Sequence, residues 1–299
     1  MRISINEQLH DIPAEMTLDQ LRRHKYPGAD ICVLNGAETK ANTPLQSGDR
    51  VVFICSGHTP STEEFNAMLK ARHGVEVQQT LERSCVAIAG VGGLGSNVAI
   101  ALARAGIGCL IIADQDVVEL SNLQRQQYFL DQIGCPKVTA MATTLKRINP
   151  GLHLTTHHTR VDSHNLTELF ASAHILVEAF DHASAKAELT QTWLQTFPER
   201  PLVAASGVAG FGAANSIITQ RPFARLYVCG DGASAVEAVG SLCASRVGVA
   251  ASHQAHAVVR LLLGLDPLTD TPTTKHNSPI DKTLSNTEKI DIDKKQCGG

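Results

Sequence analysis

The most regular hydrophobic pattern begins at Ser84, where short apolar runs alternate with longer amphipathic stretches. Short apolar runs bounded by turn residues are typical of strands, and the periodic stretches between them are typical of helices. Strands are predicted at 85–89, 109–113, 152–157, 175–179 and 202–205. Helices are predicted through Arg104, over 136–148 and over 183–196. Repeated strand–helix units favour an α/β fold with a doubly wound, Rossmann-like and mostly parallel sheet.

The pattern weakens toward the end of this region. Residues 213–219 and 225–229 are expected to add antiparallel strands, and a last helix is expected at 244–263. From Asp266 onward the chain is rich in Thr, Asp, Lys, Asn and Ser, with few large apolar residues. Such a composition predicts a flexible tail.

The first 57 residues predict a separate α+β unit. Thr17 is followed three residues later by Gln20, which is the capping box of a helix start. Asn35-Gly36 is a strong hairpin signal after the apolar run ICVL. Strands are expected on both sides of the helix, at 2–5, 9–12, 31–34 and 51–55. This order of elements is a β-grasp pattern.

These patterns divide the chain into four parts, and a helix is expected to begin near Glu63 and to end near Gly74. The parts are a β-grasp domain at 1–57, a linker and helix at 58–83, a Rossmann-like domain at 84–265 and the tail at 266–299.

Composition narrows the class of protein. Lys and Arg number 26 and Asp and Glu 29, and a formal net charge of −3 weighs against nucleic acid binding through bulk charge. The N-terminal MRISINEQLH lacks an apolar secretory segment. The most apolar late stretch is a poor membrane span, because it is interrupted by His253, Gln254, His256 and Arg260. A cytoplasmic protein without a membrane span is therefore expected.

The 8 cysteines include no C-x-x-C pair, so a zinc ribbon is not expected. Several lie in apolar runs, ICVL, SCVAIAG and GCLIIA. These are predicted to be reduced, buried thiols of a cytoplasmic protein.

The first chemical motif is the glycine-rich GVGGLG, which follows a predicted strand and precedes a predicted helix. Glycines let backbone N–H groups approach a phosphate, and the helix N-terminus adds positive potential. Asp114 ends the next strand, where a carboxylate can bind ribose hydroxyls. These two features alone fit a nicotinamide or flavin enzyme as well as an ATP-binding one.

The second motif, DQDVVELSNLQRQ, spans residues 114–126. Asn122, Arg125 and Gln126 can meet on one helical turn. Arg125 has the planar fork that suits phosphates, and Lys137 follows Pro136 at a predicted helix start. Either cation alone is explained better by a solvated surface charge.

The third motif, EAFD, ends a predicted strand at Asp181. Doubly wound folds bind ligands at the carboxyl ends of their strands, and a carboxylate there can hold Mg²⁺. Asp181 alone is explained as well by a helix N-cap.

Together with GCPKV and KRINP, these motifs make residues 63–264 resemble the ThiF/MoeB family of adenylating enzymes, which are related to ubiquitin-activating proteins. The resemblance implies that ATP reacts with the C-terminal carboxylate of a small β-grasp carrier ending in Gly-Gly, giving an acyl-adenylate and pyrophosphate. It also implies a homodimer.

The same resemblance assigns roles by motif. The adenosine part would be held by the glycine loop and the following carboxylates, namely Gly90, Gly92, Gly93, Leu94, Gly95, Asp114 and Asp116. The phosphates would be held by Asn122, Arg125, Gln126 and Lys137, and Mg²⁺ by Asp181. Catalysis would come from charge stabilisation and positioning by Arg125, Lys137 and Asp181.

The N-terminal unit resembles the sulfur carrier ThiS, in MRISINEQL, VLNG and SGDRVVF. This favours the thiamine-pathway ThiF subgroup, with a cysteine desulfurase as a candidate sulfur donor. A free carrier ends in Gly-Gly, whereas here Ser56-Gly57 continues into a linker. The unit is therefore expected to be a docking or structural module and not the substrate.

Other departures concern individual residues. Many relatives bind zinc through two C-x-x-C pairs, but only Cys229 lies near that place, so no zinc is predicted. Cys229 is a candidate sulfur-relay cysteine or a buried structural thiol, and Cys243 has a weaker claim. Arg72 is the nearest match to an arginine that reaches the partner's nucleotide in relatives. Gly298-Gly299 is a candidate self-substrate or an incidental ending.

Three other functions remain open. A nicotinamide-dependent oxidoreductase would leave SNLQR, Lys137 and Asp181 unexplained. A non-catalytic scaffold would not need so complete a phosphate-binding set. Relatives that adenylate a molybdopterin-type carrier, a peptide or tRNA share the same core, and the near-neutral charge weighs against tRNA.

Overall fold

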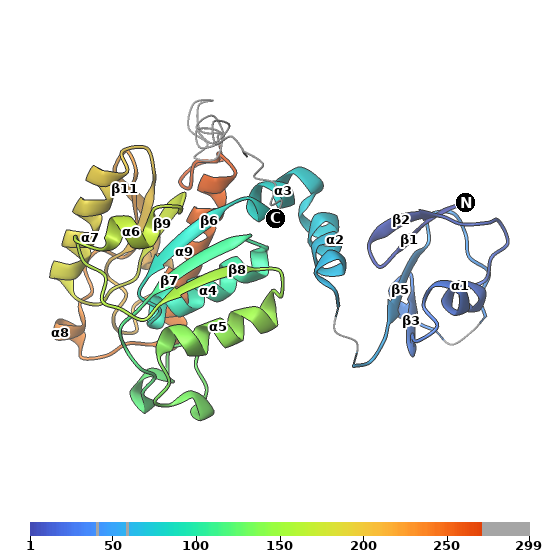
Figure 1. Cartoon of the computed structure of the whole chain (residues 1–299), viewed down its shortest axis with the longest axis horizontal. Coiled ribbons are helices and arrows are strands. Elements are labelled where there is room, and N and C mark those ends of the chain that lie inside the picture. Colours follow the sequence, from blue (N-terminus) through green and yellow to red (C-terminus); the bar gives the residue numbers. More distant parts are fainter. Residues whose placement is uncertain (40–41, 58–59, 271–299) are drawn as a thin grey trace, which may run out of the picture. The chain divides into compact units, whose positions relative to one another are not determined.

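The computed structural model describes residues 1–39, 42–57 and 60–270 (Figure 1). It divides into two compact units, Met1–Gln79 and a second unit that begins at Thr80. Within the described ranges, no helix combines the length and apolar character needed to cross a membrane. Gly298-Gly299, the candidate self-substrate, lies outside the described residues.

The N-terminal part of the first unit is a five-stranded sheet with one helix packed on it, in the strand order β2-β1-β5-β3-β4. β1 and β5 are parallel and the other pairs are antiparallel. Thr17 and Gln20 form the expected capping box at the start of the helix. The β-grasp prediction is confirmed, with β1 Arg2–Ile5, β2 Gln8–Asp11, α1 Leu18–Lys25, β3 Ile31–Leu34, β4 Ala37–Glu38 and β5 Arg50–Ile54.

Two helices follow, α2 Thr62–His73 and α3 Val75–Glu82. Ser61 and Glu64 form a capping box, and Gly74 ends α2 with a φ of 89°. Near the end of α2, the Arg72 guanidinium lies 2.7 Å from a carboxylate oxygen of Glu7 in the β1–β2 turn. This ion pair ties α2 to the β-grasp sheet.

The second unit is built on a seven-stranded sheet of order β11-β12-β10-β9-β6-β7-β8. All neighbours are parallel except β11 and β12. The order of connection reverses between β6 and β9, which is the point where doubly wound folds bind ligands. The strands are β6 Cys85–Ala89, β7 Cys109–Ala113, β8 His153–His157, β9 Ile175–Glu178, β10 Leu202–Ala205, β11 Ile218–Phe223 and β12 Leu226–Gly230.

Helices cover both faces of this sheet (Figure 1). The helices α4 Gly93–Ala105, α5 Lys137–Ile148 and α9 Ala244–Leu262 pack together on one face. The other face carries α6 Leu166–Phe170 and α7 Ala183–Thr196, whose Phe170 and Trp193 are fully buried against the strands. The remaining short helices are η1 Leu120–Asn122, η2 Leu130–Gln132, η3 Ala214–Ser216 and α8 Val236–Val239. The predicted doubly wound class is confirmed.

Two strand predictions are wrong in detail. The strand expected at 213–219 is β11, which begins only at Ile218, because residues 214–216 form the turn η3. The strand expected at 225–229 is β12, and it runs parallel to β10 and not antiparallel to the main sheet. Only the edge strand β11 is antiparallel, and its pairing with β12 shifts register beside Pro222. The alternation of residues does not encode which neighbour a strand pairs with.

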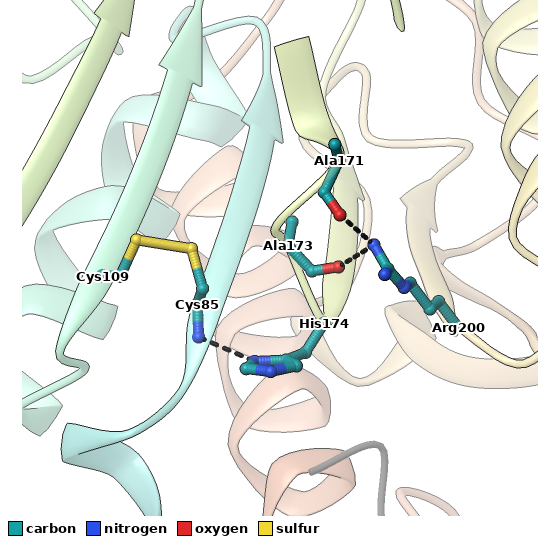
Figure 2. Close-up of a disulfide and its surroundings, with 6 residues drawn as sticks. All are labelled: Cys85, Cys109, Ala171, Ala173, His174 and Arg200. Carbon is teal, nitrogen blue, oxygen red and sulfur yellow. Dashed lines mark hydrogen bonds between the residues drawn. A yellow bond between two sulfur atoms is a disulfide. The ribbon is translucent and has the colours of Figure 1, made fainter. Parts of the chain in front are cut away.

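The prediction of reduced thiols is wrong for Cys85 and Cys109, which form a disulfide between β6 and β7 (Figure 2). The two residues are in register at the first positions of adjacent parallel strands, with their Cα atoms 4.3 Å apart. His174 lies beside them and accepts a hydrogen bond from the Cys85 N–H at 2.9 Å (Figure 2). Strand register, which the sequence does not reveal, brings the two sulfurs together.

We expect this disulfide to persist in protein purified without reductant. Proteolysis and mass spectrometry without reduction should recover the two cysteine peptides as one linked species, and Cys109→Ala should abolish it. Because the cross-link joins residues 24 apart, chain entropy predicts that Cys109→Ala lowers the free energy of unfolding by about 3 kcal/mol. Cys135→Ala, at an exposed free thiol, is the control. Recovery of both cysteines as alkylated thiols would contradict the assignment.

Candidate functional site

The glycine loop joins the end of β6 to the start of α4 at the point where the strand order reverses. Gly90 has a φ of 88°, and a Cβ there would lie 2.9 Å from the Ala179 carbonyl oxygen at the end of β9. A Cβ at Gly95 would overlap the carbonyl oxygen of Gly90. Gly92 differs, because the nearest atom to its Cβ position is the Gln126 Nε2 at 3.8 Å. Gly90 and Gly95 therefore allow close backbone packing, whereas a Cβ at Gly92 would make only an ordinary van der Waals contact.

Val91, in the centre of the loop, is held at both of its backbone polar groups. Its N–H donates to Asp114 at 2.8 Å, and its carbonyl accepts from the buried Tyr128 hydroxyl at 2.7 Å. The second oxygen of Asp114 accepts from the Asp116 N–H at 2.8 Å. Burial raises the pKa of Asp114, and the two N–H donors and Lys137 oppose this shift. The loop and the end of β7 therefore form one hydrogen-bonded unit.

The first of the two candidate cations lies beside this unit. Lys137, the first residue of α5, has a side chain that is 7% exposed. Its ammonium lies 2.7 Å from Asp116, whose side chain is 55% exposed. A positive charge is thus held just below the surface, with its partner facing solvent.

The segment from Asn122 to Gln126 packs against the start of α4. Asn97 donates to the Arg125 carbonyl at 3.4 Å, and Arg125 donates from its guanidinium to the Ser121 carbonyl at 3.1 Å. Asn122 and Gln126 are each 7% exposed. Within the described residues, the Gln126 side-chain oxygen is buried and has no hydrogen-bond partner. A buried, unpaired acceptor on a side chain that lies near Gly92 of the loop fits a bound molecule that carries hydrogen-bond donors.

Asp181 follows β9 and its side chain is 93% exposed. The loop below it is fixed by a buried ion pair, in which Lys186 lies 2.9 Å from Glu178. The same ammonium donates to the Phe180 carbonyl at 2.7 Å. In the part of the chain that the structure describes, no group of three or more His, Cys, Asp or Glu side chains could hold a metal ion. Any cation at Asp181 would therefore need oxygen ligands from a bound substrate or from water.

The two candidate cysteines have opposite environments. Burial raises the pKa of Cys229 to about 11, although the Thr219 hydroxyl at 3.6 Å lowers it. Hydrogen bonds from Ser245 and from the backbone at the start of α9 lower the pKa of the partly exposed Cys243. Thiolates are the reactive form, so Cys229 has the surroundings of a structural thiol.

Sequence reasoning missed two positions near the site. Tyr128 follows the SNLQRQ motif, and its hydroxyl partner is a backbone carbonyl that no sequence pattern identifies. Arg246, inside α9, is buried and donates to three carbonyls of the 209–213 loop, to Ser216 and to Asp231. An arginine in the first turn of a helix, with small and apolar residues following it, was the available signal for that second position.

The second unit is a doubly wound α/β domain with a glycine loop at the reversal point of its sheet, and it follows a β-grasp unit in the chain. Residues 65–299 match the ThiF family, and residues 1–57 match the ThiS-like ubiquitin family. The chain belongs to the ThiF family.

Two relatives illustrate this membership. The sulfur carrier protein ThiS adenylyltransferase of Escherichia coli is 37% identical over 143 residues, which cover 48% of this chain and 56% of that protein. The molybdopterin-synthase adenylyltransferase of Salmonella typhimurium is 32% identical over 194 residues, 62% of this chain and 76% of that protein. The match to the E. coli protein thus spans less than two thirds of its length.

Solved structures support the fold. The E. coli tRNA N6-threonylcarbamoyladenosine dehydratase, TcdA, in complex with AMP, superposes with a TM-score of 0.59 and 20% identity. The match covers 65% of this chain and 92% of that one. At this identity the likeness shows the fold alone.

We expect Gly92→Ala and Gly95→Ala to separate ligand binding from folding. An alanine methyl at 92 would have no atom closer than 3.8 Å, so the variant should keep its stability. It should lose at least about tenfold in ATP affinity, because the methyl would hinder the approach of a phosphate to the loop. An alanine methyl at 95 meets a backbone carbonyl, so the variant should lose about 2 kcal/mol of stability. Calorimetric titration and thermal denaturation measure both effects. Unchanged ATP affinity in Gly92→Ala would contradict the expected phosphate binding at the loop.

We expect the Arg246–Asp231 pair to make stability depend on acid pH. Burial opposes ionisation of Asp231, but N–H donors and Arg246 outweigh it and lower its pKa from 3.8 to about 2. A lowered pKa stabilises the folded state above pH 3.8, and this contribution is lost as pH falls toward 2. Asp231→Asn should cost about 2 kcal/mol at neutral pH and remove this part of the acid dependence.

Denaturant unfolding across this pH range provides the measurement, with Asp11→Asn at an exposed pair as the control. Parallel stability curves for the wild type and Asp231→Asn below pH 4 would refute the expectation.

Proposed function

We propose that this protein is an ATP-dependent adenylyltransferase that activates the C-terminal Gly-Gly carboxylate of a small β-grasp sulfur carrier. The observation that carries the proposal is the arrangement at the sheet's reversal point. A glycine loop and a helix N-terminus lie next to Asp114, a buried lysine and an arginine. This set suits a polyphosphate better than the two phosphates of a nicotinamide cofactor, which needs no such cations.

The proposed binding mode follows from the chain's own groups. The N–H groups of the first turn of α4 have no acceptors within the helix and can bind phosphate oxygens. Asp114 would accept hydrogen bonds from ribose hydroxyls, and Gln126 would use its unpaired oxygen toward the nucleotide. Gly90, Gly93 and Leu94 would shape the loop around it.

Charge is the main catalytic resource of this site. Arg125 and Lys137 would stabilise the negative charge that builds up on the α-phosphate and the leaving pyrophosphate. Lys137 begins from its ion pair with Asp116, so phosphate binding would exchange one anionic partner for another. Asp181 would hold Mg²⁺, which supplies charge neutralisation when it is bound. The carrier carboxylate itself is the nucleophile.

The carrier is proposed to be a separate protein. In the β-grasp unit of this chain, β5 ends at Ile54 and the backbone continues through Ser56-Gly57 toward α2, so it has no free carboxylate at that place. We propose that this unit, 1–57, serves as a docking or structural module beside the adenylating domain, 84–265. A role in thiamine thiazole biosynthesis, a homodimer and a cysteine desulfurase as sulfur donor belong to the same proposal.

ATP–pyrophosphate exchange tests the proposed function. The purified protein is assayed with Mg²⁺ and a ThiS-type carrier ending in Gly-Gly, beside a molybdopterin-type carrier and a tube without carrier. We expect exchange that depends on the ThiS-type carrier. Asp181→Asn should reduce exchange about a hundredfold, whereas Glu168→Gln, at an exposed carboxylate on α6, should not. Exchange only with the other carrier would change the substrate, and absence of exchange in every tube would refute adenylation.

A further inference from the structure

We propose that Tyr128 is a positioning residue that holds the glycine loop in its nucleotide-binding shape before ATP arrives. This inference rests on the proposed function, because it concerns the same loop. Tyr128 itself does not need to touch the nucleotide. It acts through the backbone of Val91, which is fully buried.

Two hydrogen bonds form a clamp on Val91, one to its N–H and one to its carbonyl. The Asp114 carboxylate accepts from the N–H at 2.8 Å, and the Tyr128 hydroxyl donates to the carbonyl at 2.7 Å. Tyr128 is 5% exposed, so its hydroxyl has little competition from water. The clamp therefore fixes the direction of the chain where it leaves Val91 and enters Gly92.

The loop needs such a clamp because its own sequence does not restrain it. Glycines on both sides of Val91 allow many backbone conformations, and ordering them costs free energy. If the loop were ordered only when ATP bound, that cost would reduce the affinity. A hydrogen bond already present in the free protein removes this part of the cost.

The hydroxyl of Tyr128 is a permanent donor in this place. Burial raises the pKa of Tyr128, and the nearby carboxylates of Asp114 and Asp116 raise it further. The phenol therefore keeps its proton at neutral pH. Asp114 cannot take over this task, because a carboxylate accepts hydrogen bonds and cannot donate to the Val91 carbonyl.

Tyr128→Phe separates positioning from packing, since it keeps the ring and removes only the hydroxyl. Tyr227→Phe is the matched control, because Tyr227 is also a buried tyrosine of the second unit, 4% exposed, whose hydroxyl interacts with Arg221. Both full-length variants are compared with the wild type by ATP titration calorimetry, by thermal denaturation and by hydrogen–deuterium exchange of the backbone amides of residues 91–94.

We expect Tyr128→Phe to weaken ATP binding about tenfold and to speed amide exchange in the loop by a similar factor, because one buried carbonyl loses its donor. In ATP–pyrophosphate exchange, KM for ATP should rise while KM for the carrier stays unchanged. Tyr227→Phe should alter neither ATP affinity nor loop exchange. A purely structural role for Tyr128 would lower thermal stability without this selective change.

Two results would overturn the inference, and they differ from each other. If the wild type binds ATP and Tyr128→Phe binds it equally well with unchanged loop exchange, Tyr128 does not position the loop. If the wild type itself binds no ATP, the proposed function is refuted, and the proposed role of Tyr128 in nucleotide binding is refuted with it. ATP binding by the wild type therefore distinguishes the two results, because it is present in the first and absent in the second.

Discussion

The close approach of the glycine loop to the end of β9 is the contact on which the site depends. Gly90 packs against the backbone of Ala179, and Gly95 lies against the carbonyl of Gly90. These contacts let β6, α4 and β9 meet without intervening side chains. As a result, the backbone of the loop lies directly against the end of β9. Any side chain placed in this contact would push the strand and helix apart and displace the loop.

Three ion pairs with a largely buried member hold the loops that follow the strands. Lys137 binds Asp116 after β7, Lys186 binds Glu178 at the end of β9, and Arg246 binds Asp231 after β12. The buried partners are at most 7% exposed. Moving a charge out of water costs free energy, so buried ion pairs contribute little net stability to a fold. Their common location at the carboxyl ends of the strands argues that they fix the geometry of these loops, while apolar packing against the sheet supplies stability.

Much of this architecture could be predicted because it depends on local sequence patterns. Apolar runs gave the central strands, the capping box at Thr17 gave a helix start, and the spacing of the glycine motif and Asp114 pointed to one strand-end cluster. What could not be predicted depends on contacts between distant residues. The partner of the Tyr128 hydroxyl, the loop around Arg246 and the pairing of Cys85 with Cys109 require knowledge of register and loop paths. The predicted direction of β12 was wrong for the same reason, because the residues of a strand do not determine which strand it pairs with.

The edge strand β11 has a consequence for how the sheet can grow. A regular edge presents a row of free N–H and carbonyl groups to which another chain can add a strand. Pro222 contributes no N–H, and the register shift between Gln220 and Phe223 interrupts the row in the second half of this six-residue strand. A strand from another chain would therefore meet an irregular edge on this side of the sheet, which disfavours intermolecular pairing there.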